Sequence, residues 1–269
     1  MGLRRFIKDL RNGIISQTNL VYHIFNHLTR GNLYEIKGFF NAAGLSKKPS
    51  HQKHFMVYCL KRSVTVVKLI IVILAGYFLG CSNMAWYLAK LRNADLRSGG
   101  SGNLGASNAV VLLGWKAGAI TAVHDVGKAV LAVLIARWLL PDSDFAPAAA
   151  GVACVLGHIF PFWLKFKGGK GFASFWGMTL ALNWKLALIV LAAVVIVTII
   201  TDYIVCGTLT TIISVPVYMI FTQGWLMAMI ILIATAVIII KHRENYPRML
   251  NGTELGLRSA IRGDNKLKQ

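Results

Sequence analysis

The sequence predicts an all-α polytopic membrane protein with seven transmembrane helices and three cytoplasmic loops that carry its polar motifs. Hydrophobic residues make up 56% of the 269-residue chain, and the mean hydropathy is +0.59. The apolar runs approach the ~20 residues that a spanning helix needs. A net charge of +19 would suit a nucleic-acid binder. Apolar runs of this length exclude a soluble one, so we expect anionic lipid headgroups or anionic substrates as partners and no nucleic acid.

The four cysteines lie in or beside apolar runs and form no CxxC pair. They indicate neither a disulfide framework nor a metal site, and we interpret them as small buried hydrophobic residues. No metal and no cofactor are expected. The residues are Cys59, Cys81, Cys154 and Cys206.

Residues 1–63 are expected to form a basic N-terminal extension. They contain eleven lysines or arginines against Asp9 and Glu35. No apolar run in them is long enough to cross a bilayer or to form a signal-peptide core. Composition favours a poorly ordered tail over the alternative, a weakly amphipathic helix at 20–28 on an anionic surface. Met56 could itself begin a compact membrane protein, so the sequence leaves open whether residues 1–55 are translated.

Seven spans are expected within a membrane domain at 64–254, followed by a basic cytoplasmic tail at 255–269. The fourth apolar run is short, ~17 Å at 1.5 Å per residue, so it has to tilt or borrow from the preceding loop to cross. The expected spans are 64–89, 112–140, 146–163, 172–182, 186–200, 204–221 and 225–240.

The second span carries three ionisable residues, His124, Asp125 and Lys128. Asp125 and Lys128 are three positions apart, so they share a helix face and can neutralise each other. Ionisable groups inside a span usually face the protein interior or water. We favour a structural ion pair here over a catalytic role.

The first polar segment follows the first span and interleaves glycines with serines and asparagines at 98–108. Its hydroxyls, amides and free backbone N–H groups could bind a phosphate or an oxyanion. Glycine and serine composition is equally typical of a flexible linker. The segment alone does not decide between the two.

The second polar segment, 157–171, combines three lysines with a glycine pair. Gly168 and Gly169 lack side chains, so backbone N–H groups could close on an anion, and Lys170 would add charge. It is not a Walker A loop, because the GxxxxGK[ST] spacing is absent. Taken alone, a positively charged loop that fixes membrane orientation is the favoured interpretation.

Crossing parity places the polar segments together. The chain crosses twice between the first and second segments and four times between the second segment and the basic tail, so all three face one side. That side is rich in lysine and arginine, which predicts that it is cytoplasmic. The other side holds Asp142 and Asp144 with little beyond Lys185. The extension 1–63 would then lie outside the cell, in conflict with the same charge rule.

Three motifs stand in order in these segments: SGNLGASN at 101–108, GHIFPFWLKFKGGKG at 157–171 and HRENYPRMLNGTE at 242–254. Together they resemble the acyl-phosphate:glycerol-3-phosphate acyltransferases of bacterial membranes, the PlsY family. That family's motifs have the forms SGNxGATN, GHxxPxxxxFKGGKG and HRENxxRLxxGTE. The resemblance covers roughly 64–254. One motif would be weak evidence for the family, but three motifs on one predicted face of the membrane make the resemblance specific.

The resemblance implies transfer of a fatty acyl group from acyl phosphate to the 1-hydroxyl of glycerol 3-phosphate, giving lysophosphatidate and phosphate for phospholipid biosynthesis. It also implies the bacterial inner membrane as location and the soluble enzyme that makes acyl phosphate as a further partner. No histidine has an aspartate five positions on, the HxxxxD pattern of acyltransferases with soluble donors.

By the same resemblance, Ser101 holds the acyl phosphate and the developing oxyanion, Lys170 grips phosphate, and His242 with Asn245 positions glycerol 3-phosphate. These four are the expected catalytic residues. The expected substrate-binding residues are Gly102, Asn103, Gly105, Ser107, Asn108, His158, Lys167, Gly168, Gly169, Gly171, Arg243 and Glu254.

The chain departs from the family pattern at Val111, where the family carries an arginine. Losing that cation could cost a few kcal/mol of phosphate binding, unless Arg97 or Lys116 replaces it. We therefore expect a divergent member. The alternative is a non-catalytic paralogue or a transporter of phosphorylated metabolites. The absence of broken half-helices at matching positions, as in inverted repeats, favours the acyltransferase.

Overall fold

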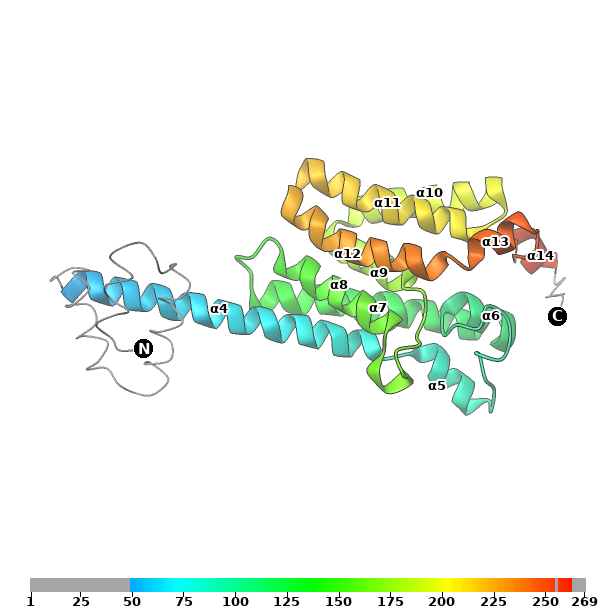
Figure 1. Cartoon of the computed structure of the whole chain (residues 1–269), viewed down its shortest axis with the longest axis horizontal. Helices are drawn as coiled ribbons and strands as arrows, with labels where there is room; N and C mark the ends of the chain where they lie inside the picture. The colour runs from blue at the N-terminus through cyan, green and yellow to red at the C-terminus, as the bar shows by residue number, and fades with distance from the viewer. Residues whose placement is uncertain (1–48, 255, 263–269) are drawn as a thin grey trace. The chain divides into compact units, whose positions relative to one another are not determined.

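The computed structural model describes residues 49–254 and 256–262, and all of its regular structure there is helical (Figure 1). The helices, labelled as in Figure 1, are α4 (Pro49–Cys81), α5 (Met84–Leu91), α6 (Ala106–Leu113), α7 (Trp115–Leu139), α8 (Ala146–Ile159), α9 (Phe172–Leu182), α10 (Trp184–Thr201), α11 (Ile204–Thr222), α12 (Trp225–His242), α13 (Asn245–Leu250) and α14 (Leu257–Arg262). A 3₁₀ turn, Phe162–Leu164, follows α8.

Six segments of the described chain are long and apolar enough to cross a membrane. They confirm a multi-span helical membrane protein. α9, with 11 residues, falls below that length, so its expected crossing stays a prediction. The six are Leu60–Leu91, Trp115–Leu139, Ala146–Leu164, Trp184–Thr201, Ile204–Thr222 and Trp225–His242.

The first described helix begins within the segment expected to be the basic N-terminal extension. α4 begins at Pro49, so residues 49–63, assigned to the extension, are helical. Residues 49–68 belong to one unit and the described residues from 69 onward form another, compact unit. The amphipathic helix considered at 20–28 lies outside the described residues.

The first expected span, 64–89, consists of two helices that meet at the polar Ser82 and Asn83. α4 ends at Cys81, and Asn83 caps α5 by accepting a hydrogen bond from the Trp86 N–H at 2.9 Å. An asparagine oxygen satisfies a free N–H at a helix start, which favours a new helix at this point. Gly114 separates α6 from α7 by its backbone conformation, a φ of +87°, with no side-chain capping bond.

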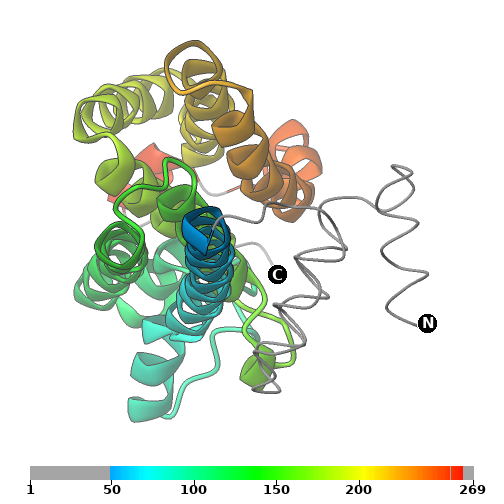
Figure 2. The same cartoon turned by 90° about the vertical axis from the view of Figure 1, so that its left-hand side faces the viewer.

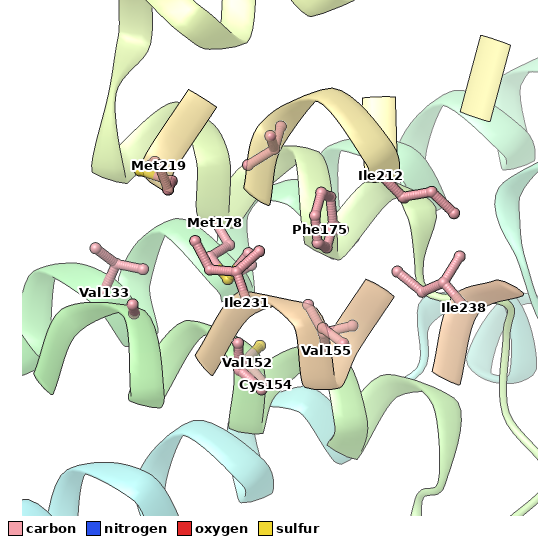
Figure 3. Close-up of a cluster of buried hydrophobic side chains, with 14 of the residues drawn as sticks. Val133, Val152, Cys154, Val155, Phe175, Met178, Ile212, Met219, Ile231 and Ile238 are labelled. Carbon is pink, nitrogen blue, oxygen red and sulfur yellow. The ribbon is translucent and has the colours of Figure 1, made fainter. Parts of the chain in front are cut away.

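The core of the second unit is a cluster of apolar side chains from α7, α8, α9, α10, α11 and α12 (Figure 3). Phe175 and Met178 of α9 lie at its centre and are fully buried. Figure 2 shows the bundle turned by 90°. Short α9 is thus held by the longer helices around it.

Small residues let α4 and α8 approach closely. A Cβ atom added to Gly80 would lie 2.1 Å from the Cys154 carbonyl oxygen, and one added to Gly76 would lie 2.4 Å from that of Ala150. Such contacts are typical of helix pairs in membranes. Cys81 and Cys154 are free and buried, as expected, whereas Cys206 is only partly buried. The side chain of Cys59 lies outside the described part.

Candidate active site

One cavity of about 130 Å³ is lined by residues from all three motifs. The motif residues at its wall are Ser101, Asn103, Gly105, Ala106, Ser107, His158, Lys170, Gly171, His242, Asn245 and Glu254. The remaining wall comes from α7, α9 and α11: Asp125, Phe172, Ala173, Ile204, Val205 and Thr208. Segments more than a hundred residues apart in the sequence therefore share one site.

The glycine–serine segment is an ordered loop pinned by Asn108, which is 1% exposed. The Asn108 side chain accepts a hydrogen bond from the Ser101 N–H at 2.9 Å and donates to the carbonyl oxygens of Leu96 and Asn103. Gly100 and Gly102 have positive φ values, 60° and 67°. The loop geometry thus supports the binding-loop interpretation over the flexible linker.

Asn103 completes this loop. Its amide nitrogen donates to Ser101 Oγ at 2.7 Å, and its oxygen accepts from the Gly105 N–H at 3.0 Å. The Ser101 hydroxyl is therefore fixed at the cavity wall. It has no triad-like partner in these contacts, which fits a role in binding charge more than a role as nucleophile.

The lysine loop folds back onto the end of α8. The Gly168 N–H donates to Ile159 O at 3.1 Å and the Gly169 N–H to His158 O at 3.2 Å. A Cβ at Gly168 would lie 2.0 Å from that same His158 oxygen. The two glycines permit this close packing, and their N–H groups are engaged in it, so they are not the free anion donors that the sequence suggested.

Of the loop's three lysines, Lys170 reaches the cavity. Lys165 and Lys167 are exposed and do not line it. The Lys170 ammonium donates to Asn245 Oδ1, and the Asn245 amide donates to Glu254 Oε1 at 2.6 Å. Burial lowers the pKa of Lys170 below its ordinary 10.5, while the nearby Glu254 carboxylate opposes that shift.

His242 ends α12 and is 4% exposed. Its Nδ1 lies 2.8 Å from the carbonyl oxygen of Ile238, which can only accept, so Nδ1 carries a proton. In the neutral ring, Nε2 is then the nitrogen left to accept a hydrogen bond from a substrate hydroxyl.

Six expected binding residues do not line the cavity: Gly102, Asn108, Lys167, Gly168, Gly169 and Arg243. Several of them shape the loops instead, as described for Asn108 and the glycine pair. The sequence assigned neither Asp125 nor Thr208 to the site. A carboxylate inside a span was the available signal for Asp125, and Thr208 offered none.

The position of the missing arginine, Val111, lies on α6 outside the cavity wall. Neither candidate replacement lines the cavity. The Arg97 guanidinium donates to the carbonyl oxygens of Leu164 and Lys167, at 3.3 and 2.9 Å. Lys116 lies over the ring of Trp115. Among the described residues, Lys170 is the lysine or arginine that lines the site.

The helices and the cavity define a multi-pass membrane protein with one charged, partly apolar site built from three separate segments. Residues 70–252 match the family described as glycerol-3-phosphate acyltransferase. The chain belongs to that family.

Its relatives include glycerol-3-phosphate acyltransferases of Thermoanaerobacter sp. (strain X514), 39% identical over 70% of this chain and 96% of the relative, and of Brucella anthropi, 38% identical over 66% and 88%. Among solved structures, the chain is similar to PlsY (YgiH), an integral membrane glycerol 3-phosphate acyltransferase, in its glycerol 3-phosphate form. The TM-score is 0.66, with 31% identity over 72% of this chain and 97% of that one.

Proposed function

We propose that the protein transfers a fatty acyl group from acyl phosphate to the 1-hydroxyl of glycerol 3-phosphate. The observation that carries the proposal is the meeting of Ser101, Lys170 and His242 at one cavity. The named activity of the relatives and the glycerol 3-phosphate and lysophosphatidic acid forms of PlsY support the acceptor and the product.

The chemistry needs orientation and charge neutralisation more than a covalent enzyme intermediate, because acyl phosphate is already activated. The hydroxyl oxygen forms a bond to the carbonyl carbon, and the bond from that carbon to the phosphate oxygen breaks. Phosphate leaves with the electron pair, and the hydroxyl proton passes to a phosphate oxygen or to His242 Nε2. Ser101 and neighbouring loop groups face the developing oxyanion.

Lys170 is suited to bind a phosphate group, and Asn245 and Glu254 hold its ammonium in place. His242 and Asn245 would then position glycerol 3-phosphate. Phe172, Ile204 and Val205 line the same cavity and offer an apolar surface for the start of the acyl chain.

The proposal includes the orientation and place of the protein in the cell. Charge bias supports motifs that face the cytoplasm across a bacterial inner membrane. Acyl phosphate would then reach the site from the cytoplasmic side, where a soluble enzyme that makes it could deliver it.

Purified protein mixed with acyl phosphate and labelled glycerol 3-phosphate tests the proposal, with lysophosphatidate as the measured product. Lys170→Met should abolish most of the rate, and Lys165→Met, an exposed lysine of the same loop, is the matched control. Efficient turnover with acyl-CoA alone, or none with acyl phosphate, would contradict it.

A further inference from the structure

A buried charged network lies beside the cavity on its α7 side. Asp125 is 1% exposed and lines the cavity, and its Oδ1 lies 2.7 Å from the Lys128 ammonium. His124 Nδ1 and His158 Nδ1 lie 3.4 and 3.3 Å from the same oxygen. The expected ion pair between Asp125 and Lys128 is confirmed, but it is part of a larger cluster.

Lys128 connects the carboxylate to His158. Its ammonium lies 2.9 Å from His158 Nδ1 and donates to Ser82 O at 2.8 Å. The Asp125 carboxylate lies 3.3 Å from that same ring nitrogen, so both members of the ion pair contact His158 Nδ1. Asp125 thus fixes Lys128, and the two together fix the position of the His158 ring.

The other edge of that ring supports the lysine loop. A Cβ atom added to Gly169 would lie 2.2 Å from His158 Nε2, and the His158 carbonyl oxygen accepts the Gly169 N–H. Lys170 follows directly. A series of contacts therefore runs from Asp125 through Lys128 and His158 to the residue beside Lys170.

We propose that Asp125 is a positioning residue for the lysine loop: through Lys128 and His158 it holds Gly169 so that Lys170 projects into the cavity. An ion pair that served helix packing alone would not need a histidine between it and the loop. Buried pairs are often no more stabilising than apolar residues of the same size, which makes a positioning role the better account of this one.

Hydrogen exchange of the Gly168 and Gly169 amides tests the inference without any assay of activity. In full-length Asp125→Asn, these amides should exchange about tenfold faster, because opening of the loop no longer breaks an ordered contact. α10 and α11 should be unaffected. Thr121→Val is the matched control: Thr121 is buried one turn earlier on α7 and bonds only to Ala117 O in the described contacts.

The kinetic readout rests on the proposed function. When the loop is in place for only a fraction of the time, the apparent KM equals the intrinsic KM divided by that fraction. Asp125→Asn should therefore raise the KM for a phosphorylated substrate about tenfold and leave kcat within about threefold. Simple loss of folded protein would instead lower kcat at unchanged KM. Asp125→Glu, which keeps the charge, should recover part of the effect.

Where Asp125→Asn does not fold, the double variant Asp125→Leu with Lys128→Met removes both charges and leaves none unpaired. Loop exchange unchanged in every folded variant, or exchange raised equally in all helices, would overturn the inference. If native protein is inert with both substrates, the proposed function fails, and the exchange experiment still decides the role of Asp125.

Discussion

Lys170, the proposed phosphate-binding lysine, lies among groups that act on its charge in opposite directions. It is partly buried, its ammonium donates to Asn245, and Glu254 lies beyond that amide. Burial favours the neutral amine, while the carboxylate and an incoming phosphate favour the charged form. The charged form is the one that would bind phosphate under the proposed function, so loss of the Lys170 proton should limit activity at high pH.

We expect kcat/KM to fall with rising pH as Lys170 of the free enzyme loses its proton. Because burial lowers its pKa, the fall should begin below the range of an ordinary lysine, 10.5. In Lys170→Arg, the guanidinium stays charged, so the remaining activity should persist to higher pH. Lys165→Arg is the control, and an identical profile for native protein and Lys170→Arg would contradict the assignment.

Val111 permits a test of the divergence at a single residue. A Cβ added to Gly100 would lie 3.7 Å from Val111 Cγ1, so the side chain at 111 borders the glycine–serine loop. Val111→Arg should raise kcat/KM about tenfold, roughly 1.4 kcal/mol, by adding a phosphate clamp. Steady-state kinetics measure the effect.

Leu112→Arg adds the same charge at the next position of α6, beside Gly99 and not Gly100, and should not improve the rate if the effect depends on the position of the cation. If Val111→Arg is neutral while Arg97→Ala is inactive, the clamp has moved to Arg97. The contacts of Arg97 with the carbonyl oxygens of Leu164 and Lys167 indicate instead that Arg97→Ala loosens the lysine loop.

The sequence identified the motif residues but not which of their side chains face the cavity. Ser101, Lys170, His242 and Asn245 were expected together and do share a cavity. Lys167 was expected there and faces away. Lys165 and Phe166 both have positive φ values, 57° and 58°, which turn the loop before Lys170. Non-glycine residues rarely adopt that conformation, so the residue pattern contained no sign of the turn.

At the scale of helices, the length and apolarity of the sequence runs predicted well where the spans lie. They predicted poorly where the helices within those runs break. Six expected spans overlap the helical segments that can cross a membrane. The polar Cys81-Ser82-Asn83 indicated an interruption of the first span, and α4 ends there, whereas the break at Gly114 was not expected. Both breaks lie in or beside apolar sequence that would also suit one long helix, and the capping contact of Asn83 decides otherwise.

The contact between α4 and α8 makes a stability prediction. In Gly80→Ala, the new methyl group would meet the Cys154 carbonyl oxygen, a backbone atom that cannot rotate away. We expect a loss of about 1–3 kcal/mol from overpacking. Gly127→Ala is the control, because a Cβ there meets no atom within 4 Å. Thermal unfolding in detergent compares them, and equal midpoints would contradict the close approach.

The path of the lysine loop within the second unit explains why α9 is short. The lysine loop ends at Gly171, which lines the same cavity as Asp125. Asp125 lies ten residues into α7, ~15 Å along that helix. The loop therefore enters the bundle before α9 begins, and a membrane crossing by α9 together with this loop stays a prediction. At the far end of α9, Asn183 donates to Tyr218 Oη of α11.

The contacts of the tail agree with the crossing parity. Asp202, in the turn between α10 and α11, accepts hydrogen bonds from the N–H groups of Leu257 and Arg258, at 2.7 and 2.8 Å. That turn and the tail thus lie at one end of the unit, beside α11 residues that line the cavity. Between that turn and the third motif the chain passes through two more helices, α11 and α12. An even number of crossings would return it to the same side.

Sidedness is the prediction that this arrangement makes for the whole molecule. Ser98→Cys, Lys165→Cys and Arg243→Cys place single thiols at exposed positions in or beside the three motif segments, and Asp142→Cys places one in the turn between α7 and α8. The native cysteines are replaced by alanine first. A membrane-impermeant maleimide should label the first three only in inverted vesicles and Asp142→Cys only in right-side-out vesicles, because lysine and arginine are retained in the cytoplasm. Labelling of any one motif from the side opposite to the other two would exclude a single site, whereas reversal of all four would keep the site and refute its cytoplasmic orientation.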